Sequence, residues 1–254
     1  MISIKTKEEI EIIKEGGKIL AKIMRELEKM AKPGITTKEL DGAAEALILK
    51  HGAKPSFKGY KGFPSSLCTS VNEEIVHVIP SDRVLEEGDI VSLDLGALYK
   101  GFHTDMAITV GIGKISKKAR ELIKTTRETL DFVIKKIKPG INTNEVGGLI
   151  EKFIEKKGFG VVRELCGHGI GKNIHEDPQI PNYRDSRQGA ILKEGMIICL
   201  EPMVTIGDWH IKKAKDNYGF QTKDNSLAAH FEHTIAVTKD GSEVLTLHPS
   251  ESDF

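Results

Sequence analysis

Apolar residues recur at helical spacing in four segments of the chain. The predicted helices cover residues 6–30, 37–51, 116–137 and 143–157. In the first of them, the residues that fall roughly on one face are Ile10, Ile13, Ile19, Leu20, Ile23 and Leu27. Gly52 closes the second helix. The Gly16-Gly17 pair lowers the stability of the first helix, so it indicates close packing at that point.

Short apolar runs of strand length alternate with these helices. The predicted strands cover residues 67–71, 74–78, 90–95, 106–110, 160–165, 196–200 and 231–237. Turns with glycine and charged residues separate them, and a loop rich in Gly, Pro and Ser covers about residues 53–66. Because strands and helices are mixed without regular βαβ alternation, we predict an α+β fold with a mostly antiparallel sheet.

One short phrase occurs twice, and each copy ends in a carboxylate. Residues 85–94 read Leu-Glu-Glu-Gly-Asp-Ile-Val-Ser-Leu-Asp, and residues 192–201 read Leu-Lys-Glu-Gly-Met-Ile-Ile-Cys-Leu-Glu. At this offset of 107 residues, Asp94 lies opposite Glu201. A duplicated strand that ends in an acid in each half predicts a site at the seam between two related halves.

A second repeat widens this duplication. Residues 32–53 and 138–159 are identical at eleven of 22 aligned positions, at an offset of 106. Thr37 and Thr143 are read as N-caps after a Pro-Gly turn. Two ordinary helix starts would explain the turn and the cap but not the matching helix body and closing glycine. We therefore predict one domain over residues 1–254, internally duplicated at roughly 1–112 and 113–254.

Composition narrows the setting of this domain. Lys plus Arg and Asp plus Glu both total 37, so the net charge of zero gives no sign of a nucleic-acid partner or a membrane surface. The apolar runs are too short to span a membrane, and the first residues do not resemble a signal peptide. The three cysteines, Cys68, Cys166 and Cys199, fit no C-x-x-C pattern, so a reducing cytoplasm is the simplest location.

Acidic residues lie in several predicted strands. Asp94 and Asp105 belong to strands on either side of Gly96 and Gly101, which predicts a hairpin with a loop that brings the two carboxylates together. Burying two like charges is costly unless they share a proton or a metal ion lies between them. For an isolated pair of acids, exposure to solvent at a turn would be the better alternative.

The second half supplies comparable groups. Glu201 ends an apolar strand, and Glu232 lies inside another, where a charge needs a partner. His168 lies between two glycines, in Cys-Gly-His-Gly-Ile-Gly at residues 166–171. A lone histidine in such a loop is more often structural than a ligand, but four acids in strands favour a metal site. Neither H-E-x-x-H nor G-x-S-x-G occurs, which excludes the thermolysin-type zinc helix and the usual hydrolase elbow.

Together these motifs resemble those of type I methionine aminopeptidases over essentially the whole chain. The motifs that carry the resemblance are Asn72-Glu-Glu-Ile-Val-His77-Val-Ile-Pro80, Asp94 with Asp105, Cys166-Gly-His168-Gly-Ile-Gly-x-x-x-His175-Glu-Asp-Pro178, Glu201-Pro202 and Phe231-Glu232-His-Thr. The resemblance implies the pita-bread fold, in which two pseudo-symmetric halves surround a mostly antiparallel, curved sheet. It also implies removal of the N-terminal methionine from nascent proteins when the second residue is small.

The resemblance further implies a dinuclear metal centre. Its ligands would be Asp94, Asp105, His168, Glu201 and Glu232. Asp105 and Glu232 would bridge the two ions, His168 and Glu201 would complete one site, and Asp94 the other. Four carboxylates and one imidazole suit divalent Mn, Fe or Co, with Zn and Ni as alternatives.

By the same resemblance, three residues would carry the chemistry. Glu201 would exchange the proton of the attacking water, while His77 and His175 would contact the substrate and the tetrahedral intermediate. A packed strand histidine is the alternative for His77, because Val76 and Val78 flank it.

The methionine pocket would be lined by Tyr60, Phe63, Cys68 and Ile174, with Phe220 or Trp209 covering it. The chain departs from the family pattern where the segment between Trp209 and Gln221 is longer than usual. A second departure is His230, which replaces a commoner glutamine and could place a polar group beside the metal ions.

The resemblance implies that the substrates are the N-termini of nascent polypeptides, so the enzyme is expected to come transiently close to the ribosome. It is expected to be a monomer. Proline-specific relatives of this fold carry a long additional N-terminal domain, and type II methionine aminopeptidases carry a helical insertion in the second half. A metal-free binding protein with this fold would lack ligands that this chain retains.

Overall fold

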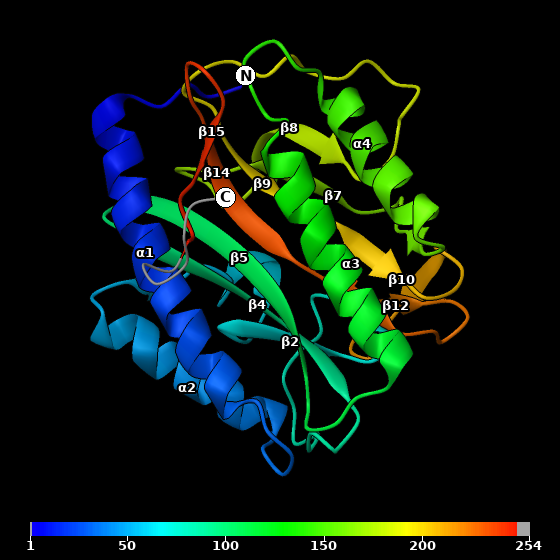
Figure 1. Cartoon of the computed structure of the whole chain (residues 1–254). Helices are drawn as coiled ribbons and strands as arrows, with labels where there is room; N and C mark the ends of the chain where they lie inside the picture. The colour runs from blue at the N-terminus through cyan, green and yellow to red at the C-terminus, as the bar shows by residue number, and fades with distance from the viewer. Residues whose placement is uncertain (1, 248–254) are drawn as a thin grey trace.

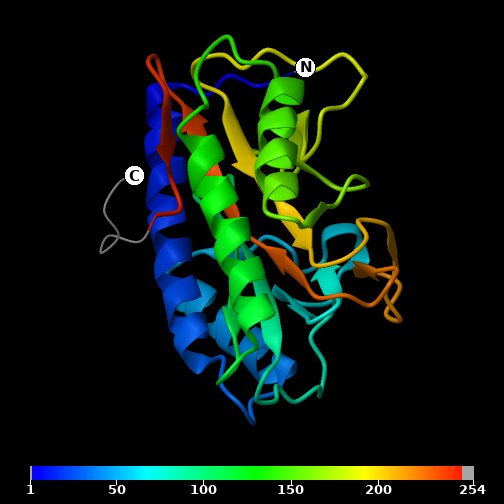
Figure 2. The ribbon, with the colours of Figure 1, turned by 45° about the vertical axis from the view of Figure 1, so that its right-hand side comes forward.

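The computed structural model describes residues 2–247, so Met1 and residues 248–254 of the predicted domain lie outside the described residues. The described residues contain four α-helices: α1 (Lys7–Met30), α2 (Thr37–Lys50), α3 (Lys117–Ile134) and α4 (Thr143–Lys156). They lie against one side of the sheet, where α1 and α3 run beside each other (Figures 1 and 2). Among residues 2–247, no helix has the length and apolar content that a membrane span requires.

A nine-stranded sheet forms the centre, and every strand pair in it is antiparallel, as predicted. Its order is β1-β4-β5-β14-β9-β7-β8, with β2 on β4 and β15 on β14. Its strands are β1 (Lys54–Pro55), β2 (Leu67–Val71), β4 (Ile90–Tyr99), β5 (Phe102–Gly111), β7 (Cys166–Gly169), β8 (Glu176–Pro181), β9 (Ile197–Leu200), β14 (Glu232–Val237) and β15 (Ser242–Val244). The two halves of the chain meet where β5 pairs with β14.

Two three-stranded sheets lie beside the central one. The first, in the order β13-β10-β6, contains β6 (Gly160–Val161), β10 (Met203–Thr205) and β13 (Ala228–His230). The second, in the order β11-β12-β3, contains β3 (Glu74–Val76), β11 (Ile211–Lys213) and β12 (Phe220–Thr222). This second sheet joins a segment of the first half to a hairpin of the second half, which brings both to one side of the site.

The helix boundaries follow local capping chemistry, and one detail of the prediction is wrong. Thr36, not Thr37, caps α2, because its hydroxyl accepts from the backbone of Glu39 while the Glu39 carboxylate accepts from Thr36. In α4 the cap is Asn142 rather than Thr143. The predicted cap positions are therefore the first helical residues, one position too late in both repeats.

Several strands differ in length from the prediction. The β4–β5 hairpin has longer strands and a shorter turn, and β3 and β6 are shorter than expected. The predicted hairpin loop is a two-residue turn at Lys100 and Gly101, both with positive φ, and Gly96 lies inside β4. The predicted strand at residues 160–165 shortens to β6, and β3 ends before His77, whose φ of 62° cannot continue a strand.

Matching contacts at the repeat offsets support the predicted duplication. Gly34 donates to the carbonyl oxygen of Leu85 at 2.9 Å, and Gly140 donates to that of Leu192 at 2.9 Å. Each half also has its own core: α1 and α2 pack on β2 and β4, whereas α3 and α4 pack with β9. The duplication stays a prediction, and the structure shows equivalent elements at the expected offsets.

The close packing predicted at Gly16-Gly17 is confirmed. A Cβ at Gly17 would overlap the carbonyl oxygen of Leu245. Gly17→Ala is therefore expected to lower the free energy of unfolding by about 1 kcal/mol or more, because overpacking outweighs the gain in helix propensity. The matched control is Gly42→Ala in α2, where a Cβ meets nothing within 4 Å. That variant should gain about 0.5–1 kcal/mol in urea denaturation, and equal gains in both variants would contradict this packing.

Candidate active site

Three acidic side chains converge where the two halves meet. Asp94 and Glu232 both pair with Ala107, from opposite sides of β5, so they share one row and one face of the sheet. Asp105 lies two residues before Ala107 on the same strand and therefore faces the same way. The hairpin prediction for Asp94 and Asp105 thus agrees with the structure, and Glu232 joins them from the other half.

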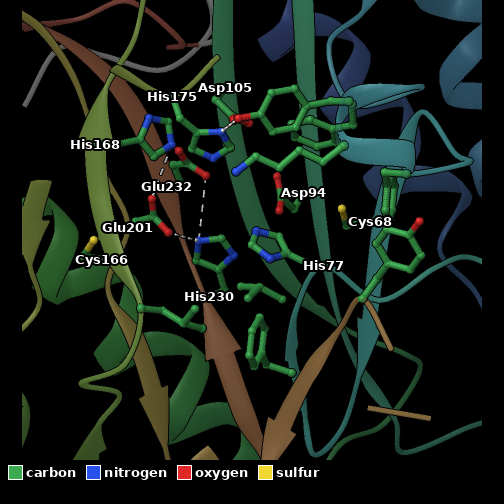
Figure 3. A pocket seen from close by; sticks show the side chains of 18 of the residues that line it. Cys68, His77, Asp94, Asp105, Cys166, His168, His175, Glu201, His230 and Glu232 are labelled. Atoms are coloured by element: carbon green, nitrogen blue, oxygen red, sulfur yellow. Dashed lines mark hydrogen bonds and ion pairs between the residues drawn. The ribbon is translucent and has the colours of Figure 1, made fainter. Parts of the chain in front are cut away.

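The second half contributes two further candidate ligands. His168 pairs with Cys199, which in turn pairs with Thr234, and Thr234 exchanges hydrogen bonds with the backbone of Asp105. Glu201 lies two residues after Cys199, so its side chain is on the same face as that of His168. Figure 3 shows the five predicted ligands turned toward one another.

Several of the converging carboxylate oxygens have no partner. Asp94 Oδ1, Asp105 Oδ1 and Glu232 Oε1 are buried without a hydrogen bond. One oxygen from each of these three residues lies within 4.8 Å of the others. An unpaired buried carboxylate is costly, so three of them at one point require shared protons or a cation.

Burial strongly changes the acidity of these groups. Burial raises the pKa of Asp94 to about 7. Burial, followed by the charges of Glu232 and Asp94, raises the pKa of Asp105 well above its usual value. The pKa of Glu201 is also raised, first by burial. The carboxyl groups therefore retain protons near neutral pH unless a cation replaces them.

His168 is arranged as a neutral nitrogen donor. Its Nδ1 lies 2.9 Å from the carbonyl oxygen of Gly169, which can only accept, so Nδ1 carries the proton. The Nε2 lone pair then faces Glu201 Oε1 at 3.6 Å. Burial lowers the pKa of His168 to about 4, which keeps this nitrogen unprotonated at neutral pH.

The donor set therefore fits divalent metal ions of the harder kind. Four carboxylates and one neutral imidazole surround the space, as the sequence predicts. The structure adds Cys199, whose sulfur lies within 4.8 Å of donor atoms of His168 and Glu232. Burial raises the pKa of this thiol, so it remains protonated and is a poor ligand. The sequence could have indicated this, because Cys199 lies two residues before Glu201 in the same predicted strand segment.

His230 adds a further polar group to the site. Its Nε2 lies 4.0 Å from Glu201 Oε2 and 3.8 Å from Glu232 Oε2. Both of its ring nitrogens are buried without a hydrogen bond. The departure from the family pattern at this position therefore places an imidazole directly beside two predicted ligands.

The other two histidines of the predicted site, His77 and His175, line the cavity. His77 follows β3 with positive φ and is exposed to the cavity, so it is not a packed strand histidine. His175 Nδ1 lies 3.0 Å from the Tyr60 hydroxyl, and its ring centroid is 4.4 Å from that of His168. The surrounding protein desolvates both rings and lowers the pKa of His77 and of His175 to about 4. Both are therefore neutral at pH 7.

An aromatic cavity of about 300 Å³ adjoins the acidic residues. Tyr60, Phe63 and Cys68 line it as predicted, and Ile174 packs behind Phe63 and Cys68. The lining includes Phe220, whose ring centroid is 6.2 Å from that of His77.

Trp209 does not reach this cavity. It stacks on His210 with ring centroids 3.8 Å apart and lies beside Arg163, so of the two candidates Phe220 is the one that lines the cavity. Sequence reasoning missed Tyr218, which lines the cavity, packs edge-on against Phe63 and donates to the Gly62 carbonyl oxygen at 3.0 Å. Tyr218 lies in the segment between Trp209 and Gln221, whose unusual length could have marked it as a candidate.

Metal binding is expected to depend on pH through these carboxyl groups. A bound cation requires the carboxylate, so protons must be released from groups whose pKa is raised, such as Asp94 with a pKa of about 7. The apparent affinity for Mn²⁺ should therefore fall as pH decreases below about 7. Titration calorimetry in two buffers of different ionisation enthalpy measures the proton release. An affinity that stays constant between about pH 5.5 and 7.5 would contradict this expectation.

Comparison with known proteins agrees with this geometry. A sequence model of metallopeptidase family M24 matches residues 11–239. A methionine aminopeptidase from Clostridium acetobutylicum is 48% identical over 248 residues, which cover 97% of this chain and 99% of the relative.

Two solved structures locate the fold. A methionine aminopeptidase from Thermotoga maritima superposes with a TM-score of 0.94 at 45% identity and covers 97% of this chain and 99% of its own. A prolidase from Pyrococcus horikoshii superposes with a TM-score of 0.78 at 27% identity and covers 98% of this chain but 64% of its own. These structures confirm the predicted α+β pita-bread fold.

Proposed function

Because this chain belongs to metallopeptidase family M24, among its methionine aminopeptidases, we propose that its five converging ligand candidates hold two divalent metal ions. The chain is a metal-dependent aminopeptidase that removes the N-terminal methionine of polypeptides. The observation that carries the proposal for the site is the set of unpaired, buried oxygens on Asp94, Asp105 and Glu232. They lie at the closed end of an aromatic cavity, beside the His168 imidazole.

The proposed ions would be held as the resemblance implies. Asp105 and Glu232 lie where the halves meet and would contact both ions; His168 and Glu201 would complete one site, and Asp94 the other. When bound, two such ions lower the pKa of a water molecule and polarise the scissile carbonyl. We propose Mn²⁺, Fe²⁺ or Co²⁺, because oxygen donors dominate the site and the one nearby thiol is protonated.

Glu201 would move the proton. It is largely buried, and burial raises its pKa, which suits a carboxylate that accepts a proton from water and gives it to the leaving amine. His168 Nε2 lies 3.6 Å from its Oε1, and His230 Nε2 lies 4.0 Å from its Oε2. One imidazole thus lies beside each oxygen of the Glu201 carboxylate, at a distance longer than a hydrogen bond.

His77 and His175 would stabilise the developing oxyanion. Both are neutral near pH 7 because desolvation lowers the pKa of each ring. When the Tyr60 hydroxyl donates to His175 Nδ1, Nε2 carries the proton and can donate into the cavity. A hydrogen bond that strengthens as negative charge develops lowers the barrier.

The methionine side chain would occupy the aromatic part of the cavity. Phe63, Cys68 and Phe220 offer apolar and polarisable walls, which suit a thioether. The second substrate residue would then lie beside His77 and His175.

Cleavage of defined peptides tests this proposal. Protein loaded with Mn²⁺, Fe²⁺ or Co²⁺ is expected to release methionine from Met-Ala-Ser and not to cleave an X-Pro peptide. Failure to release methionine with any of these ions would overturn the assignment, and preferential cleavage of the X-Pro peptide would favour a proline-specific activity.

The setting of the reaction follows from its substrate. Nascent chains present their N-termini in the cytoplasm, so we propose a cytoplasmic enzyme that acts as a monomer, transiently near the ribosome. Size-exclusion chromatography with light scattering tests the monomer, and a stable dimer would contradict it.

A further inference from the structure

Two lysines lie at the mouth of the cavity, one from each half of the chain. Lys61 lies in the 3₁₀ turn η1 (Tyr60–Gly62) of the first half, and Lys213 ends β11 in the second half. Both line the cavity and both are exposed. Neither is part of the catalytic assignment above.

Aromatic walls fix the position of both ammonium groups. Lys213 Nζ lies 3.9 Å from the ring centroid of Phe220 and donates to the Tyr218 carbonyl oxygen at 3.3 Å. Lys61 Nζ lies 5.3 Å from the ring centroid of Tyr60. Because Phe220 and Tyr60 are themselves walls of the cavity, these cation–π contacts keep both charges at its rim.

These two ammonium groups differ from those of other exposed lysines in the described part of the chain. Within residues 2–247, neither lysine forms an ion pair, whereas other exposed lysines such as Lys58 and Lys100 do. The carboxylate of Asp216, three residues after Lys213, accepts hydrogen bonds from the backbone amides of Ile79, Tyr218 and Gly219. The charges also act inside the cavity, since both lysines add to the effect of burial in lowering the pKa of His77.

A peptide substrate must pass this rim. With the methionine in the aromatic part of the cavity, the remaining chain leaves through the mouth at about 3.3 Å per residue. The third to fifth residues of the substrate therefore lie within about 10 Å of the rim, inside the range of unscreened charge at low salt.

We propose that Lys61 and Lys213 make the enzyme prefer substrates with acidic side chains at positions three to five. The proposal rests on the proposed function and specifies its substrate class. Bound divalent ions would balance the acidic residues deep in the site, so the two rim lysines set the sign of the field that the departing chain meets.

The chain offers a matched control next to Lys213. Lys212 is on the same strand but does not line the cavity, and its Nζ donates to the Lys223 carbonyl oxygen and to Asn225 Oδ1. Lys212→Gln removes the same charge from the same hairpin without changing the rim. It separates a local effect at the mouth from a change in net charge.

The experiment compares peptides of the form Met-Ala-X-X-X-Ser, amidated at the C-terminus, in which X is Glu, Gln or Lys. In about 20 mM salt, kcat/KM for the Glu peptide should exceed that for the Lys peptide by roughly ten-fold, and in about 0.5 M salt the ratio should approach one. The Lys61→Gln/Lys213→Gln variant should lose most of this ratio, and Lys212→Gln should retain it.

The Gln peptide keeps the two proposals separate. If it is not cleaved, the proposed function fails. If it is cleaved while the ratio of Glu to Lys peptides is near one, or persists in the double variant, the proposed role of the two lysines is wrong. A double variant that slows all three peptides equally would also overturn it, because the lysines would then act on the catalytic histidines and not on the substrate.

Discussion

Glu201→Gln is expected to lower kcat/KM for Met-Ala-Ser by about 10³-fold, within the range of roughly 10²–10⁴ for loss of a general acid–base group. Glutamine keeps the size of the side chain but cannot accept a proton, and it replaces an anionic ligand with a neutral one. Its neighbours His168 and His230 would keep their positions, because they are held by other contacts or by burial. Steady-state kinetics with the metal content determined on the same samples measure the effect.

Glu194→Gln is the matched control for this variant. Glu194 belongs to the same copy of the repeated phrase, seven residues earlier, and its side chain is exposed. Surface substitutions of this kind usually change stability by less than about 0.5 kcal/mol, so activity should match the unmodified protein. A Glu201→Gln enzyme that retains more than about a tenth of its activity with full metal content would remove Glu201 from the proton transfer.

His77→Ala is expected to lower kcat by about 10²–10³-fold, the cost of removing one donor to a developing oxyanion. Metal content should remain nearly unchanged, because His77 lies outside the five predicted ligands. Alanine is a suitable replacement. Like histidine it has a Cβ atom, so the backbone strain at the φ of 62° should be similar in the variant and the unmodified protein.

A parallel His175→Ala variant gives the comparison. It should also lose turnover and retain metal, and its loss should include the effect of releasing Tyr60, which bonds to His175. Full activity in both variants would contradict the assignment of the two histidines, and loss of metal in either would show that the residue acts as a ligand.

The two acids at equivalent repeat positions are not structurally equivalent. Asp94 lies inside β4, which continues to Tyr99, whereas Glu201 lies just beyond β9. Pro202 follows Glu201 and has no amide hydrogen, so it cannot continue the strand ladder. Glu201 is therefore outside the strand ladder, whereas Asp94 is held within it, and the proposed roles of the two carboxylates differ in the same way. The two predicted repeats therefore contribute structurally different carboxylates to the site.

Much of this architecture could be predicted from local sequence patterns. Apolar periodicity located α1, and the apolar run at Leu67–Val71 gave β2 with its observed bounds. The glycines between two apolar strands predicted the hairpin that carries Asp94 and Asp105, and the repeat offset aligned Asp94 with Glu201. These features depend on residues that are close in sequence, so a pattern alone can carry them.

Features created by tertiary contact were missed or left open. The choice between Trp209 and Phe220 depends on β12 pairing with β3, which brings Phe220 to the cavity and leaves Trp209 on Arg163. Tyr218 reaches the site by the same pairing. The N-cap of α2 was predicted at Thr37 but is Thr36. Two adjacent threonines offer the same hydroxyl group, and only the backbone geometry selects one of them.

Anomalous diffraction from a crystal of the protein loaded with Mn²⁺ tests the central claim most directly. The proposed site predicts two peaks about 3.5–4 Å apart, enclosed by Asp94, Asp105, His168, Glu201 and Glu232, with Asp105 and Glu232 contacting both ions. No peak among these five residues, or manganese bound only elsewhere on the protein, would contradict the account.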